Sequence, residues 1–229
     1  MSLFQKAFTI GGALLSTFGG DIISEYKTVQ GESYSEFTEK KSKFISNCAN
    51  VNSQEQALQY ITKVKSKYHG AKHSVYAYCI HNSKILKYSD DAEPHGTAGL
   101  QLLTVIKNFE LENAVIVVTR YFGGILLGVG GLSRAYRKSA EDCIKNSHIV
   151  TEKLCLVIKF TISYAYIRQV SSILNSNVSL IKKIDYGELI EVAAYVEKEN
   201  FNLINEKLSK CLGGKINLSV LEEKYHSLE

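Results

Sequence analysis

The chain has 229 residues, 45% of them hydrophobic, which is enough for one large domain or two small ones. Its formal net charge of +4 is only a weak lean toward polyanions and excludes a strongly basic, histone-like protein. The five cysteines are widely spaced and form no CxxC or Cys/His ligand pattern. We therefore expect reduced thiols in a cytoplasmic protein, with no structural zinc and no other metal or cofactor.

Residues 1–23 are expected to be a mobile extension outside the fold. Their segment FTIGGALLSTFGG is weakly apolar, and it could be a short signal sequence or a vector-derived or mis-started extension. The segment is too short and too polar to span a bilayer, so we expect no membrane association.

From residue 26 to residue 46, polar and apolar residues alternate loosely, which favours antiparallel strands with a break near Gly31. A helix follows. Ser53 and Gln56 form a capping-box pattern, and the apolar residues after them fall on one helical face. Gly70 stands where a glycine commonly ends a helix.

The next elements are a hairpin, a helix, a central strand and a second helix. Thr97 is expected to cap the first of these helices. The run AVIVVT is continuous and β-branched, which is typical of a strand covered on both faces. The expected bounds are 73–80 and 84–88 for the hairpin, 97–109 for the first helix, 114–119 for the central strand and 132–146 for the second helix.

The second half of the chain shows a different order of expected strands and helices. Its elements are expected at 154–162, 166–174, 178–184, 188–196, 201–212 and 215–221. Their order, βαββαβ, is the plan of a ferredoxin-like fold. The fold class is therefore predicted to be α+β, with two closely packed domains at 24–149 and 150–229.

An acidic turn, DDAEPHGTAG, carries Asp90, Asp91 and Glu93 just before the first expected helix after the hairpin. Negative charge is favoured at a helix N-terminus, which gives these carboxylates a structural interpretation. They could also hold a divalent cation, or divide the roles of acid and base between them. A further alternative is an ion pair with Arg120 or Arg134 that closes two loops onto each other.

Two histidines are candidate bases. His95 lies inside the acidic turn, where a neighbouring carboxylate favours its charged form, and His73 begins a strand. A solvated turn histidine is the simpler interpretation. Serine and cysteine nucleophiles have no evident base beside them, so the sequence specifies no reaction.

A basic Gly-rich turn, TRYFGGILLGVGGLSRAYRKSA, follows the central strand. Its glycines could gather backbone amides around an anion, or simply permit a sharp strand-to-helix reversal. The spacing fits neither a P-loop nor a dinucleotide fingerprint. Phe122 is expected to be core, whereas Tyr121 and Tyr136 interleave aromatic surface with the charges, as in single-strand nucleic-acid binders. The candidate anion or nucleic-acid ligands are Arg120, Tyr121, Gly123, Gly124, Gly128, Gly130, Gly131, Arg134 and Arg137.

Arg134 is expected in the first turn of the helix after the glycines, where free amides and the positive helix end attract phosphate. Arg120 ends the preceding strand. The two arginines are therefore expected to converge on one cleft with the acidic turn.

The two motifs, DDxEPxGTAG and VVTRYFGGxxLGxGGLxRAY, resemble the IMPACT/YigZ family. The resemblance is strong over residues 24–149 and covers the remainder by element order only. It implies an N-terminal domain like domain two of ribosomal protein S five, and a C-terminal domain like the last domain of elongation factor G. Eukaryotic members resemble translation regulators and carry an extra N-terminal partner-binding domain, so the chain resembles the two-domain bacterial form.

Three positions depart from the family pattern. Ala92 and His95 stand where the family commonly reads DDGEPSGTAG, and Gln101 replaces a usual proline. If position 92 needs a positive φ, alanine is strained there, because only glycine adopts such a conformation freely.

We therefore predict a cytoplasmic regulator of translation or of a stress response, which binds RNA or the ribosome through the Gly-rich turn. The alternative is an enzyme, either a hydrolase or one that binds a small anion or phosphate ligand, using the acidic turn with Arg120 and Arg134. A plain protein-interaction module is a third possibility, and the sequence indicates no oligomeric state.

Overall fold

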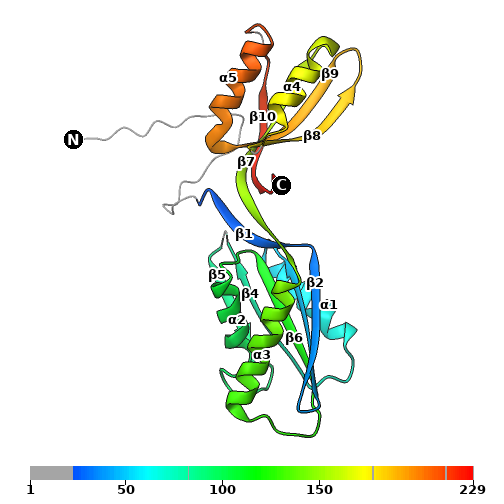
Figure 1. Ribbon diagram of the computed structural model, residues 1–229, viewed down its shortest axis with the longest axis vertical. Coiled ribbons are helices and arrows are strands. Elements are labelled where there is room, and N and C mark those ends of the chain that lie inside the picture. Colours follow the sequence, from blue (N-terminus) through cyan, green and yellow to red (C-terminus); the bar gives the residue numbers. More distant parts are fainter. Residues whose placement is uncertain (1–22, 82, 177, 215, 229) are drawn as a thin grey trace, which may run out of the picture.

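The computed structural model describes residues 23–81, 83–176, 178–214 and 216–228, and shows an elongated α+β molecule with two lobes (Figure 1). Each lobe contains one sheet, so the predicted α+β class is confirmed. Residues 1–22 of the expected mobile extension lie outside the described part of the chain.

The lower lobe in Figure 1 is built on an antiparallel sheet in the order β2-β3-β6-β4-β5. Its strands are β2 (Glu32–Glu39), β3 (Ser42–Asn50), β4 (His73–Ile80), β5 (Ile85–Ser89) and β6 (Ala114–Tyr121). Its helices are α1 (Gln54–Lys67), α2 (Gly99–Asn108) and α3 (Gly128–Lys145).

Strand β6 lies at the centre of this sheet and is covered on both faces, as its β-branched run predicts. Val115 and Val117 pack with the apolar side chains of α1. Ala114, Ile116 and Val118 point the other way, toward α2 and α3. Successive side chains of a strand alternate between its faces, so a continuous apolar run requires two cores.

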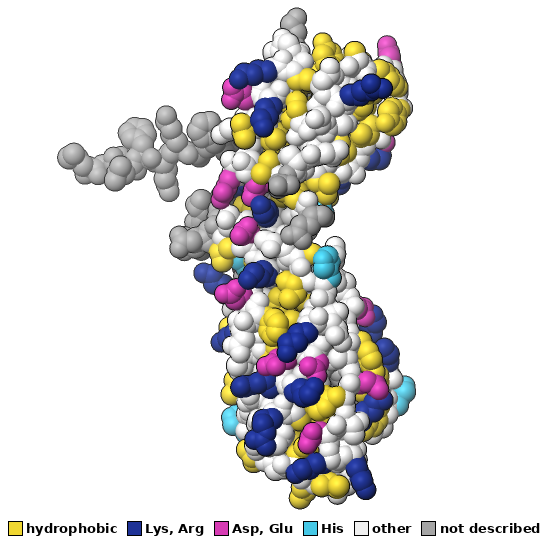
Figure 2. All heavy atoms as spheres, viewed as in Figure 1, with side chains coloured by type: hydrophobic (Ala, Val, Ile, Leu, Met, Phe, Trp, Pro, Cys, Tyr) yellow, Lys and Arg dark blue, Asp and Glu magenta, His cyan; other side chains and the backbone are white. Residues whose placement is uncertain are grey.

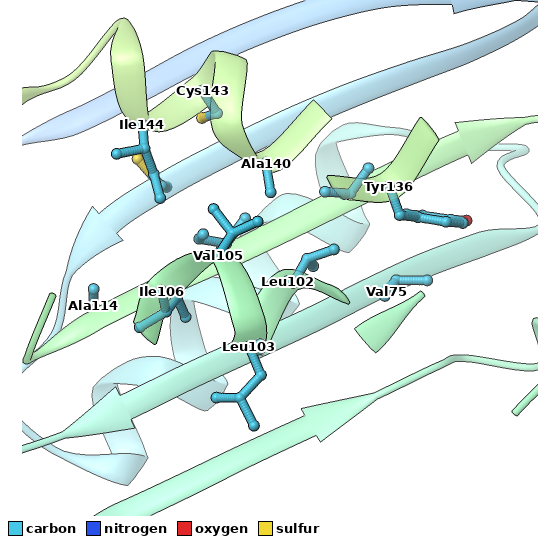
Figure 3. Close-up of a cluster of buried hydrophobic side chains, with 14 of the residues drawn as sticks. Val75, Leu102, Leu103, Val105, Ile106, Ala114, Tyr136, Ala140, Cys143 and Ile144 are labelled. Atoms are coloured by element: carbon cyan, nitrogen blue, oxygen red, sulfur yellow. The ribbon is translucent and has the colours of Figure 1, made fainter. Parts of the chain in front are cut away.

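The larger of the two cores lies under α2 and α3 (Figure 3). Leu102 and Ile106 of α2 and Ile144 of α3 are fully buried there. Each such side chain contributes about 1.5–3 kcal/mol through burial. This core fixes how both helices lie on the sheet, and thereby where their N-termini emerge.

The start of α1 confirms the predicted cap. The Ser53 side chain accepts a hydrogen bond from the N–H of Gln56 at 3.2 Å. The Gln56 side-chain oxygen in turn accepts from the N–H of Asn52 at 2.8 Å, one residue before the donor of a standard capping box.

The predicted cap of α2 is wrong. The helix begins at Gly99, and the Thr97 hydroxyl donates to the carbonyl of Pro94 at 2.6 Å instead. The carboxylate of Asp90 takes the capping role, because its Oδ1 accepts from the N–H groups of Ala98 at 3.1 Å and Gly99 at 2.8 Å. A cap that lies eight or nine residues upstream leaves no local signal in the sequence.

Helix α3, in contrast, begins earlier than predicted, at Gly128 rather than at residue 132. Buried Leu132 and Tyr136 hold the helix against the core, and its glycine-rich first turn continues the same helix. Arg134 therefore lies in the second turn of α3 and not in the first. Strand β6 in turn extends to Tyr121, which places Arg120 inside the sheet.

The upper lobe contains β1 (Glu25–Gln30), β7 (His148–Ile162), α4 (Ile167–Leu174), β8 (Ser179–Tyr186), β9 (Ile190–Glu197), α5 (Phe201–Cys211) and β10 (Ser219–His226). Short 3₁₀ turns, Tyr164–Tyr166 and Lys198–Asn200, precede α4 and α5. From β7 onward the elements follow the expected order of strand, helix, two strands, helix and strand. The strands lie side by side as β10-β7-β9-β8, and buried residues such as Ile158, Val192 and Leu208 join the sheet to its helices.

The last strand was predicted at 215–221, but β10 runs from Ser219 to His226. Its sequence, SVLEEKYH, is polar and shows no apolar run. The strand exists because it pairs antiparallel with β7, with Val220 opposite Ile158 and Tyr225 opposite Leu154. Long-range pairing, not local pattern, sets these bounds.

Strand β7 links the two lobes. Its first residues pair with β1, from Gln30 opposite His148 to Glu25 opposite Lys153, and its later residues pair with β9 and β10. The expected boundary between residues 149 and 150 thus falls inside a continuous strand. Strand β1, which the sequence assigned to the first domain, joins the sheet of the upper lobe.

Candidate nucleic-acid interface

Four connections of the lower lobe meet at the end farthest from the upper lobe (Figure 1). We call them the loop end: residues 39–42, 68–73, 90–98 and 121–131. The register brings them together, because Lys43 lies opposite Tyr121, and Arg120 lies opposite both Phe44 and His73. The acidic turn and the Gly-rich turn therefore share one end of the molecule.

The carboxylate of Asp90 accepts hydrogen bonds from the backbone of its own loop. Besides its two bonds to the start of α2, its Oδ2 accepts from the N–H of Gly96 at 2.9 Å. The exposed ring of His95 lies 3.7 Å from the same oxygen. These contacts satisfy the carboxylate and stabilise the helix start.

The carboxylate of Asp91 also has partners within the protein. Its Oδ2 accepts from the N–H of Ser74 at 2.6 Å, and its Oδ1 lies 3.1 Å from the ammonium of Lys65. Its carbonyl oxygen accepts from Nδ1 of His73 at 2.9 Å, because a carbonyl cannot donate. The acidic turn is thereby tied to the first residues of β4.

Glu93 is buried with Arg120. Its Oε1 accepts from Nη1 of Arg120 at 2.7 Å and from the hydroxyl of Tyr136 at 2.7 Å. The alternative in which an ion pair closes the two loops onto each other is thus present in the structure. Burial raises the pKa of Tyr136, and the negative charge of Glu93 raises it further, so the phenol remains a neutral donor.

The Arg120 guanidinium is held on several sides. It lies 5.6 Å from the ring centre of Phe44 and 5.4 Å from that of Phe122, both cation–π distances. Its Nη2 donates to the Ser42 hydroxyl at 3.4 Å. The expectation that Phe122 is core is wrong, because its ring covers Arg120 from the surface and is itself exposed.

The Gly-rich turn is seated on the β2–β3 turn. The N–H of Gly123 donates to the Ser42 hydroxyl at 3.2 Å. A Cβ added at Gly123 would lie only 2.0 Å from the carbonyl carbon of Lys41, so this position requires glycine for close approach. Gly124 requires it for another reason, a φ of +84°.

The acidic turn contains strained backbone. Ala92 has a φ of +66° and Asp91 a φ of +44°. The positive φ considered for position 92 is therefore confirmed, and the alanine there is strained.

Lys40 and Lys41 form the β2–β3 turn with φ of +43° and +64°, values uncommon for lysine. Both are exposed, as are Lys72 and Arg134, and none of these four cations forms an ion pair with a described residue. Glu39, at the start of the same turn, is exposed as well.

Arg134 lies over the start of α3. Its Nη1 is 3.5 Å from the position that a Cβ on Gly130 would occupy. No side chain caps this helix, and its first turn contains no acidic residue. The start of α3 thus combines uncapped amides, the positive end of the helix dipole and a nearby guanidinium.

The other predicted ligands are placed around this centre. The Tyr121 hydroxyl donates to the carbonyl of His69 at 3.1 Å, and Arg137 donates to the Gln101 side chain at 2.9 Å. Gly128, Gly130 and Gly131 form the first turn of α3.

Arg120 and Arg134 do not share one cleft. Arg120 turns inward to Glu93, whereas Arg134 is exposed. The expectation that Tyr136 offers an aromatic surface among the charges is wrong, because its side chain is fully buried and donates to Glu93. Sequence reasoning missed the supporting residue Ser42, which has no local signal. It also missed Lys40 and Lys41, although two adjacent lysines between alternating segments are a detectable turn signal.

Among the described residues, no group of three or more His, Cys, Asp or Glu side chains is placed to hold a metal ion. None of the helices in the described part of the chain has the length and apolar character needed to cross a membrane. All five cysteines are free thiols.

Comparison with known sequences adds relatives. Residues 40–144 match the family described as the Impact N-terminal domain. The chain is 35% identical to the IMPACT family member YvyE of Bacillus subtilis, over 89% of this chain and 94% of that protein. It is 28% identical to YigZ of Escherichia coli, over 80% and 92%. It is also 31% identical to human Protein IMPACT, but over only 51% of this chain and 35% of that protein.

Comparison with solved structures supports the fold alone. A crystal structure of a protein described as hypothetical superposes with a TM-score of 0.58 and 24% sequence identity. The match covers 89% of this chain and all of the other. Both lobes therefore have a counterpart in that structure.

Proposed function

We propose that this chain, which belongs to the IMPACT family, binds RNA through the loop end of its lower lobe and regulates translation in the cytoplasm. One observation carries the proposal. The three carboxylates of the acidic turn are engaged inside the protein, whereas Lys40, Lys41, Lys72 and Arg134 of the same end are exposed without an ion pair to any described residue.

The electrostatic consequence is a basic surface. Carboxylates that are satisfied by backbone amides, by Lys65 and by Arg120 contribute little free negative charge to their surroundings. Exposed lysines and arginines that form no ion pair within the described part of the protein attract a polyanion and release its counterions on binding. Hydrophobic and basic side chains adjoin at this end of the molecule in Figure 2.

The start of α3 supports phosphate recognition in particular. Phosphate oxygens accept hydrogen bonds from the free amides of a helix N-terminus, and the glycines there let a ligand approach the backbone closely. Arg134 lies over this turn and can pair with the same phosphate. Arg137 adds a cation one turn further along the helix.

The enzyme alternative finds no comparable support. Asp90, Asp91 and Glu93 each have structural partners, and His73 is committed through Nδ1 to a backbone carbonyl. These contacts stabilise the loop that carries them. No observation among the described residues brings a nucleophile and a base together.

We also propose that the two lobes are the two domains that the family resemblance implies. The strand order β10-β7-β9-β8 with α4 and α5 supports a ferredoxin-like C-terminal domain, similar to the last domain of elongation factor G. The lower lobe would correspond to domain two of ribosomal protein S five. Such a pair of domains fits a partner as large as the ribosome.

The test is a titration of a fluorescent single-stranded RNA at several salt concentrations. We expect log K to fall with log salt by roughly 0.7 per phosphate neutralised. Arg134→Ala should weaken binding and reduce that slope by roughly 0.7, because one phosphate contact is lost.

The matched control is Arg168→Ala, which removes an exposed arginine from α4 in the upper lobe. It should leave affinity and slope unchanged. If both variants bind as the wild type does, or if the wild type shows no salt-dependent RNA binding, the proposal fails.

A further inference from the structure

The loop end exposes a small apolar tip. Leu126 is 82% exposed, Val129 is 65% exposed and Ile125 is 43% exposed, and all three lie in the Gly-rich turn or the first turn of α3. Their neighbour Leu127 packs inward against the core. Exposed aliphatic side chains that gather on a protruding turn are costly in water, and such patches commonly mark contact sites.

The tip is held in place from both sides. On one side the Phe122 ring covers Arg120, and the N–H of Gly123 donates to the Ser42 hydroxyl. On the other side Leu127 anchors the start of α3 in the core. A tip that is fixed in this way presents its side chains without a further cost of ordering them.

Charge around the tip identifies its partner. The twenty residues from Tyr121 to Ala140 contain no aspartate or glutamate, and they include Arg134 and Arg137. Lys40 and Lys41 lie in the turn on which Gly123 is seated. An apolar tip with cations on the neighbouring turn and on the helix that follows it fits a polyanion that also offers apolar faces, which is the character of unpaired nucleobases on a phosphate backbone.

We propose that Ile125, Leu126 and Val129 act as a wedge that inserts between the bases of RNA at unpaired or bulged positions, while the surrounding cations hold the phosphates. This inference rests on the proposed RNA binding. Nucleic-acid-binding proteins insert apolar side chains such as Leu and Ile between base steps and partly unstack them. A membrane anchor requires a wide amphipathic face or a second signal, so the small tip favours RNA over a lipid surface.

The experiment uses the full chain and two RNA hairpins of equal length, one fully paired and one with a bulge that carries 2-aminopurine. The fluorescence of this base rises when it is unstacked. The wild type should raise the fluorescence and bind the bulged hairpin more tightly. Leu126→Ser should lose most of the fluorescence rise and bind the bulged hairpin about tenfold more weakly, with an unchanged salt slope. Leu203→Ser, an exposed leucine of α5, is the matched control and should behave as the wild type.

The outcomes separate the two proposals. If Arg134→Ala reduces the salt slope but Leu126→Ser retains the full fluorescence rise, RNA binding stands and the wedge is overturned. If the wild type binds single-stranded RNA but neither hairpin, RNA binding stands and the wedge is overturned; if it binds no RNA at all, both proposals fall. If Leu126→Ser abolishes binding to vesicles of phosphatidylserine and phosphatidylcholine while RNA binding is unaffected, the tip contacts lipid and the wedge is again overturned.

Discussion

Nη1 of Arg120 lies 2.7 Å from Oε1 of Glu93, with the two side chains only 6% and 4% exposed. The pair joins the end of β6 to the acidic turn, and Tyr136 donates to the same carboxylate oxygen. A buried pair is not by itself evidence of high stability, but removing one partner leaves an uncompensated charge in a medium of low polarity.

Arg120→Met should therefore lower the free energy of unfolding by about 3–5 kcal/mol, because Glu93 would remain buried without its cation. Urea unfolding followed by circular dichroism measures the loss. Arg134→Met is the matched control, since that arginine is exposed and forms no ion pair with a described residue; we expect a change within about 0.5 kcal/mol. Equal stability of the two variants would contradict a structural role for Arg120.

Ala92→Gly should stabilise the protein by about 1 kcal/mol, because the φ of +66° at this position strains a residue with a Cβ. Thermal melts of both proteins would show a higher midpoint for the variant. Ala165→Gly, in an exposed 3₁₀ turn without positive φ, should have the opposite sign. A destabilised Ala92→Gly would mean that the turn relaxes in solution.

Two adjacent glycines should differ in the cost of substitution. Gly123→Ala places a Cβ 2.0 Å from the carbonyl carbon of Lys41. Because the backbone must move to relieve this overlap, we expect the free energy of unfolding to fall by about 3 kcal/mol or more. Gly124→Ala meets no atom within 4 Å and costs only the strain of its φ, about 1–2 kcal/mol. Chemical unfolding of both variants tests the order, and the reverse order would show that the Gly-rich turn does not sit on the β2–β3 turn.

The stability of the upper lobe should depend on the protonation of His226. Burial lowers the pKa of this residue, whose ring stacks on Tyr195 at 3.8 Å between centroids. The pKa of His226 is lower in the folded state than in the unfolded state, so at pH values between the two the unfolded state binds more protons. Stability is then present above the unfolded pKa, about 6.5, and is lost as pH falls through the folded value.

The His226→Gln variant should accordingly lose less stability than the wild type between about pH 7.5 and about pH 5. Urea titrations at each pH measure this difference. An identical pH dependence for the two proteins would remove His226 as a contributor.

Several features of the molecule could be predicted from the sequence because they depend on residues a few positions apart. The β-branched run of β6, the cap of α1 at Ser53 and the order of elements from β7 onward are of this kind. The strain at Ala92 was suspected on a different ground, the glycine that the family pattern has at that position, and the φ of +66° agrees with it. The motifs themselves identified the family.

Only the tertiary structure decided which partners those residues meet. Arg120 and Glu93 are 27 residues apart, and Tyr136 and Glu93 are 43 apart, so their meeting depends on how β6, α3 and the acidic turn pack. The cap of α2 by Asp90 and the pairing of β1 with β7 have the same origin. A local pattern records the periodicity of burial, whereas the choice of partner across loops depends on strand register and helix packing, which are set by the whole core.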